Sequence, residues 1–82
     1  MQNEKLYKQA IEIAVDAAER FLAAVEVNNT FGDNRALQEK HRKMEVQPAA
    51  AIACAQQEMI ASLFCVSDEK VHEDITQLLT GR

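Results

Sequence analysis

Three carboxylates on the predicted first helix have a spacing that could hold a metal ion. Glu12, Asp16 and Glu19 follow one another by four and three residues, so they share one face of a helix. Carboxylate oxygens are suitable ligands for divalent cations, but a stable site needs several of them to converge. No second predicted helix offers a matching set of carboxylates. We therefore expect these three carboxylates to lie on a solvated face. A metal-dependent enzyme that uses this acidic face is kept as the second alternative function.

The other residues capable of chemistry do not form a recognisable site. His72 is followed by Glu73 and Asp74, but successive helical residues point about 100° apart and cannot converge on one ion. The sequence has no Ser-His-Asp, Cys-His or phosphate-binding glycine pattern, and it contains two glycines in all. It predicts a protein that is not an enzyme, with no catalytic, cofactor-binding or metal-binding residue and no cofactor.

Two cysteines lie on one predicted helix. Cys54 and Cys65 are eleven residues apart, which separates them by roughly 16 Å along the helix axis. A disulfide needs Cα atoms within about 7 Å of each other, so an intrachain bond on this helix is excluded. Unpaired thiols are typical of a reducing compartment, and we expect a cytoplasmic protein in which both cysteines serve as small apolar side chains.

A basic cluster marks the predicted second helix, from about Arg35 to Val46. Glu39 and Glu45 lie among its basic residues, so a solvated helix face is one interpretation. The other is a docking face for an acidic patch on another protein. A regulator that contacts nucleic acid here is the first alternative function, although nucleic acid is disfavoured by the net charge of -4. The basic docking face consists of Arg35, Lys40, Arg42 and Lys43.

The first helix is predicted to run from a cap at Asn3 to about Val27. Its apolar residues recur at helical spacing and cover an arc of roughly 200°, with charged residues on the remaining arc. One neighbouring helix needs an apolar face of only about 100°. This helix is therefore expected to contact two surfaces.

Part of that wide arc resembles the seam of a helix dimer in its spacing. Its residues step by three and four, and its alanines let another helix come close. The seam can be used within the chain or across a dimer axis. We expect a homodimer or an obligate heterodimer, with the contact formed by Ile11, Ala14, Ala18, Phe21, Leu22 and Val25.

The run from Pro48 to Val66 is predicted to be the central helix. Pro48 suits a first helical turn, and Gln47 before it is biased away from helical geometry, so a break or kink is expected there. The polar group from Gln56 to Glu58 makes a membrane span unfavourable, and we expect no membrane contact. The expected core arc is Val66, Met59, Ile52, Leu63, Ile60, Ala53 and Phe64.

Gln56 interrupts this arc. A buried amide without a partner costs roughly 1–3 kcal/mol, so one interpretation places Gln56 at the edge of the core in contact with water. The other is a polar residue that sets the register of a helix–helix or dimer contact. The sequence does not decide between them.

The last helix is predicted to begin after Ser67 and to end at Gly81. Ser67 is a strong N-cap, and Asp68 and Glu69 fall in the first turn, where the helix dipole favours acidic residues. Because Ser67 follows the central helix directly, the chain must turn sharply there. Val71, Ile75, Leu78 and Leu79 form the apolar stripe.

Composition sets the fold class. The 82 residues are 48% hydrophobic but only 5% aromatic, so much of the apolar content is small and the core of a single chain is thin. We expect one helical domain over residues 1–82, built as a small all-α bundle of three long or medium helices plus one short surface helix. The favoured function is a small protein–protein interaction module that acts as adaptor, chaperone, inhibitor or regulator, as a dimer, for a partner whose identity the sequence does not give.

Overall fold

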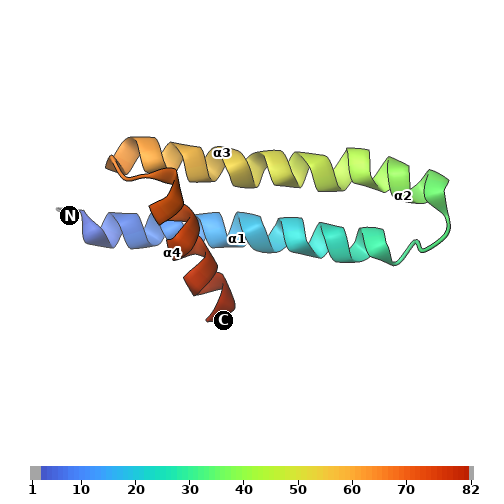
Figure 1. The fold of residues 1–82 in the computed structure, drawn as a ribbon, viewed down its shortest axis with the longest axis horizontal. Helices are drawn as coiled ribbons and strands as arrows, with labels where there is room; N and C mark the ends of the chain where they lie inside the picture. The colour runs from blue at the N-terminus through green and yellow to red at the C-terminus, as the bar shows by residue number, and fades with distance from the viewer. Residues whose placement is uncertain (1–2, 82) are drawn as a thin grey trace.

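The computed structural model describes residues 3–81 and contains helices joined by short turns, with no strand in that range. A long helix and a second one of similar length run antiparallel, side by side, as a hairpin, and a shorter helix folds back across one side of it (Figure 1). The prediction of a small all-α bundle is confirmed. The elements are α1 (Glu4–Asn29), α2 (Arg35–His41), the π-helical turn η1 (Arg42–Val46), α3 (Gln47–Phe64) and α4 (Asp68–Thr80).

Helix α1 begins and ends close to the predicted positions. Asn3 precedes its first turn, where its carbonyl accepts the Tyr7 N–H at 2.9 Å, but its side chain makes no capping hydrogen bond. The helix continues two residues beyond Val27 to Asn29. The chain then reverses through Gly32, whose φ of 56° is in the left-handed region that glycine adopts without strain.

Of the break or kink predicted at Gln47, the break is wrong, because α2, η1 and α3 form one continuous helix over Arg35–Phe64, and the irregularity is the π-helical turn that ends directly before Gln47. Gln47 has helical φ and ψ angles of -62° and -45°, and its N–H donates to the Arg42 carbonyl five residues earlier. A proline ring in a regular helix clashes with the carbonyl four residues before it, here that of Met44. The wider turn immediately before Pro48 provides room for the ring, so the helix continues instead of breaking.

The sharp turn predicted between the last two helices is confirmed. Cys65 adopts left-handed angles (φ 55°, ψ 44°) and ends α3, and the helices on either side meet at 120°. The Ser67 hydroxyl accepts the Lys70 N–H at 3.1 Å, as expected for an N-cap. At the other end of α4, Gly81 donates its N–H to the Gln77 carbonyl at 3.0 Å.

The core lies where α4 crosses the hairpin. Val15 and Val71 are completely buried there. The predicted core arc of α3 is wrong in part, because Ile52, Met59 and Leu63 are 57%, 56% and 70% exposed. The reason is that α4 docks on the other flank of α3, which turns Ala61 inward. The buried residues are Tyr7, Ile11, Ala14, Val15, Ile60, Ala61, Val71 and Ile75.

Candidate functional site

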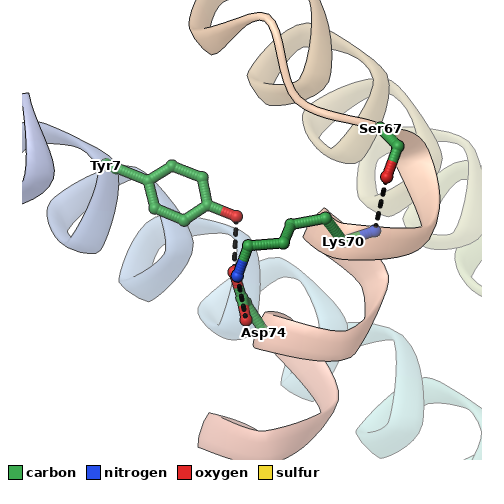
Figure 2. A network of polar contacts seen from close by, with 4 residues as sticks. All are labelled: Tyr7, Ser67, Lys70 and Asp74. Carbon is green, nitrogen blue, oxygen red and sulfur yellow. Dashed lines mark hydrogen bonds and ion pairs between the residues drawn. The ribbon is translucent and has the colours of Figure 1, made fainter. Parts of the chain in front are cut away.

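A polar network fixes α4 on the first turns of α1. The Tyr7 hydroxyl donates to Asp74 Oδ2 at 2.6 Å, and Lys70 Nζ lies 3.1 Å from the same oxygen (Figure 2). The ring of Tyr7 also packs edge-on against Phe64, with centroids 5.4 Å apart. A single side chain of α1 therefore contacts both α3 and α4, and it sets where the short helix crosses the hairpin.

The electrostatics of this network follow from its geometry. Burial and the hydrogen bond to Asp74 together raise the pKa of Tyr7 to about 12, because both disfavour the phenolate. The hydrogen bond from Tyr7 and the nearby Lys70 ammonium hold the pKa of Asp74 below its ordinary value. Asp74 is therefore an ionised acceptor at neutral pH, and Tyr7 is a neutral donor, so the contact is a charge-assisted hydrogen bond.

Helix α4 covers only one flank of the hairpin. Tyr7, Lys8, Ile11 and Glu12 of α1 face it, and Ile13, one residue further along, points to the other side of the helix. In Figure 1, α4 crosses in front of α1, and none of the described helices lies behind the hairpin. The second flank of the α1–α3 pair is therefore open.

Large apolar side chains gather on the open flank. Ile13 and Ile52 line a shallow groove between α1 and α3, together with Ala17 and Ala49 and with the charged residues Asp16 and Arg20 of α1. Helical spacing places Leu6 on the same face as Ile13, and Met59 and Leu63 on the same face as Ile52. We name this set the open strip; it comprises Leu6 (55% exposed), Ile13 (57%), Ile52 (57%), Met59 (56%) and Leu63 (70%).

The outer surface of α3 is unusual for a solvent-facing helix. Among its 18 residues, Glu58 alone carries a charge. Surface helices normally place charged residues opposite their buried stripe, and a helix that is apolar nearly all round is normally buried. Ala51, Cys54 and Ala55 are nevertheless exposed, as are the large side chains of the open strip. The composition of α3 is therefore that of a helix covered on more sides than this single chain covers.

Gln56 also lines the groove on the open flank. Its side chain is partly buried. Within residues 3–81 its amide makes no hydrogen bond, and no buried side-chain nitrogen or oxygen there lacks a partner, so the amide reaches the surface at the edge of the core. It lies in the middle of α3, between Ile52 and Met59. The structure thus places one polar group with two donors and an acceptor among the apolar residues of the strip.

The strip is large enough to matter energetically. Complete burial of a large aliphatic side chain stabilises by about 1.5–3 kcal/mol, and each strip residue still has more than half of its surface to bury. Covering all five would contribute about 4–9 kcal/mol before the costs of association are subtracted. Association itself costs roughly 4–15 kcal/mol, so burial of this strip alone accounts for weak binding, and a tighter complex needs burial of the partner's apolar surface as well.

The predicted dimer seam is divided by the structure. Ile11 and Ala14 are buried in the core of the chain itself, so they are used within the chain. Ala18, Phe21 and Val25 are partly buried, and Leu22 is 44% exposed. The seam is thus not a continuous exposed surface. Ile52, Met59 and Leu63, predicted to be core residues, are exposed instead. The signal that could have marked them as a surface is that α3 carries only one charged residue.

The predicted basic docking face is exposed but partly neutralised. The Arg42 guanidinium donates to Glu39, with Nε and Oε2 3.1 Å apart, and Lys43 Nζ lies 3.8 Å from the same carboxylate. The hydrogen bond from Arg42 lowers the pKa of Glu39. Arg35 and Lys40 are exposed as well. Docking of an acidic partner on this face remains a prediction.

His41 holds the start of the second arm against the end of α1. Its Nδ1 lies 3.0 Å from Asn28 Oδ1, and its ring meets Phe31 with centroids 5.3 Å apart. These contacts give His41 a packing role at the end of the hairpin remote from α4.

The remaining chemistry-bearing residues stay apart. Glu12, Asp16 and Glu19 are exposed on α1. Within residues 3–81, no three His, Cys, Asp or Glu side chains lie close enough together to hold a metal ion. Cys54 and Cys65 are free thiols, and both are exposed, which corrects the expectation that they pack as small apolar residues.

Length and composition do not allow any one helix of residues 3–81 to cross a membrane; only the bent pair Arg35–Phe64 and Asp68–Thr80, taken together, satisfies both criteria. We find no match of the chain among protein-family models, curated proteins or solved structures.

Proposed function

We propose that this chain is a small, non-enzymatic protein-interaction module, an adaptor, chaperone or regulator, that binds its partner through the open strip. The observation that carries the proposal is the uncovered apolar flank of the hairpin, with Ile52, Met59 and Leu63 more than half exposed on a helix that has one charged residue. Exposed apolar surface of this kind marks interaction sites in soluble proteins.

The covered flank supports the same proposal. On that flank, packing of α4 buries Val15 and Val71 completely, and the Tyr7 hydroxyl donates a hydrogen bond to Asp74. This contrast supports the proposal that a second molecule covers the open flank. The free thiols of Cys54 and Cys65 support a reducing compartment such as the cytoplasm.

The test is affinity capture with a matched pair of variants. The bait Met59→Glu/Leu63→Glu places two charges on the strip, whereas Ala23→Glu places one on the exposed outer side of α1. We expect proteins from an extract of the producing cells to be retained by wild type and Ala23→Glu, and lost with the double variant. Circular dichroism and thermal unfolding establish that each bait is folded. Identical retention by all three would overturn the proposal.

A further inference from the structure

We infer that the partner covering the open strip is a second copy of this chain, with α3 packed antiparallel against the α3 of that copy across a two-fold axis near residues 55–56. The inference rests on the proposed function, because it names the occupant of the same surface. In this arrangement α3 of each copy lies along the groove between α1 and α3 of the other, where Ile13 and Ile52 are exposed.

The order of residues along α3 is self-complementary. Ile52 lies three residues before Ala55, and Met59 lies three residues after Gln56. In the same way, Pro48 lies seven residues before Ala55, and Leu63 lies seven residues after Gln56. Two copies related by a two-fold axis present the same patch to each other. A residue before the axis in one copy therefore faces the residue that lies equally far after the axis in the other copy. Ile52 therefore meets Met59 of the second copy, and Ala55 and Gln56 lie nearest the axis.

The side chain of Gln56 can pair with the same side chain of a second copy. An amide group carries both donors and an acceptor, so two copies of the same amide can bond to each other. The Gln56 amide has no hydrogen-bond partner within residues 3–81 and is accessible at the surface of the groove, beside the position of the axis, so a second copy can reach it. A polar residue in an apolar helix contact is a known device for setting register, and Gln56 would set it here.

Charge also favours self-association through this face. A chain with a net charge of -4 repels its own copy over most of its surface. On α3 the only charged residue is Glu58, which helical spacing places away from Ile52 and Met59. The α1 side of the groove adds one acidic and one basic residue, Asp16 and Arg20, so the face that two copies would share carries little net charge.

The face also has about the area that a stable dimer needs. Its 18 residues make α3 about 27 Å long, and the α1–α3 pair is about 20 Å wide, which gives about 540 Å² in projection. Accessible area exceeds projected area because side chains protrude. The contact therefore approaches the roughly 800 Å² per partner of standard specific interfaces.

The first experiment is sedimentation equilibrium of the purified chain over a range of concentrations. Wild type is expected to reach twice its chain mass of 9.2 kDa at micromolar concentration. Met59→Glu is expected to raise the dissociation constant by about 100-fold or more, and Ala23→Glu to leave it within about threefold, since only the former puts a charge among the apolar side chains of the contact. A wild type that stays at one chain mass at high concentration overturns the inference, as does a dimer that Met59→Glu leaves intact.

The second experiment asks whether residue 56 meets its own copy. Gln56→Glu keeps the shape of the side chain, but two facing carboxylates repel each other when both are ionised. Compared with wild type at the same pH, we expect this variant to dimerise much more weakly at pH 7 and nearly as well near pH 4, where most of the introduced carboxyls are protonated. A dimer of Gln56→Glu equally tight at both pH values would contradict the two-fold axis near residues 55–56.

A cross-link checks the same geometry directly. In a chain with Cys54 and Cys65 replaced by Ser, Ala55→Cys is expected to give a disulfide-linked dimer on mild oxidation, and Ala23→Cys is not. Equal cross-linking of the two would overturn the geometry. The capture experiment described under the proposed function separates the two proposals: a monomeric wild type whose strip variant still loses a captured protein refutes the second copy alone.

Discussion

The two flanks of the α1–α3 hairpin differ in what covers them. On one flank, α4 seals the core, and a buried tyrosine bonds to an aspartate of the crossing helix. On the other flank, five aliphatic side chains of similar size remain more than half exposed. The 13 residues of α4 are too few to cover both sides of a hairpin whose longer arm has 30 residues, so α3 is covered on one side and exposed on the other.

The distribution of charge follows the same division. Helix α4 carries Asp68, Glu69 and Lys70 in its first turn, as expected for a helix that faces water on its outer side. Helix α3 carries one charge in 18 residues. It therefore has the composition of an inner helix, between α4 on one side and the proposed second copy on the other.

The largest effect is expected from a matched pair of isoleucines two positions apart on α1. Ile11 is 5% exposed and faces the covered flank, and Ile13 is 57% exposed and faces the open one. Ile11→Ala is expected to lower the free energy of unfolding by about 2–5 kcal/mol, because it leaves a cavity in the core. Ile13→Ala is expected to change it by about 0.5 kcal/mol or less in a monomeric Met59→Glu background.

Urea unfolding followed by circular dichroism measures both variants. Equal losses from Ile11→Ala and Ile13→Ala would contradict the distinction between the flanks. The same pair compared in wild type should give a larger loss for Ile13→Ala than in the monomeric background, since association adds to apparent stability.

The next effect concerns the contact that holds α4 in place. Asp74→Asn removes the charge that accepts from Tyr7 and Lys70, and we expect a loss of about 1–3 kcal/mol in the free energy of unfolding. Glu73→Gln, the neighbouring exposed acid, is the control and should stay within about 0.5 kcal/mol of wild type. If the two variants unfold alike, the network does not fix α4.

The pH dependence of the covered flank has a direct spectroscopic reporter, because Tyr7 is the only tyrosine of the chain and tryptophan is absent. Its pKa is raised from 10.0 to about 12, so its contribution to stability is complete below about pH 10 and is lost as pH rises through about 12. Asp74 acts in the opposite range: its pKa is lowered, so its contribution is present above the ordinary 3.8 and is lost as pH falls through the folded value.

Near-ultraviolet absorbance of the phenolate measures the titration of Tyr7. Asp74→Asn should bring the midpoint down from about 12 but leave it above 10.0, because burial remains the largest cause of the shift. A wild-type midpoint at the ordinary value would contradict the buried hydrogen bond.

The smallest effect is expected on the basic docking face, which belongs to neither flank. Arg35→Glu together with Lys40→Glu should change the free energy of unfolding by about 0–1 kcal/mol, because exposed charges contribute little to stability. If the face docks an acidic partner, the same variant should weaken capture of that partner and reduce its dependence on salt. Unchanged capture would assign the cluster to a solvated face.

Local signals in the sequence predicted most of the elements. The apolar periodicity of α1, the Ser67 cap and Gly81 at the end of α4 are all found where the residues indicated. These features depend on residues near one another in the chain. The break at Gln47 was wrong because packing of η1 against α1 stabilises a helical backbone that the residue before a proline disfavours on its own.

The candidate site could be predicted only in part, because periodicity finds apolar residues without assigning their neighbours. Ile52, Met59 and Leu63 were recognised as one apolar arc, but which side of α3 meets α4 depends on the turn at Cys65. Ile11 and Ala14 were assigned to a dimer seam, and the structure buries them within the chain. A wide apolar arc shows that two surfaces are needed, but it does not show which surface lies in the same chain.

The π-helical turn at Arg42–Val46 has a consequence for how the length of this chain can change. Such a turn contains about one residue more than a regular helical turn. It therefore rotates α2, which precedes it, by about 100° around the helix axis relative to α3. Deleting one residue there would restore the regular period and swing His41 away from Asn28 and Phe31. An insertion or deletion within this segment is thus tolerated only together with a rebuilt loop at residues 30–34.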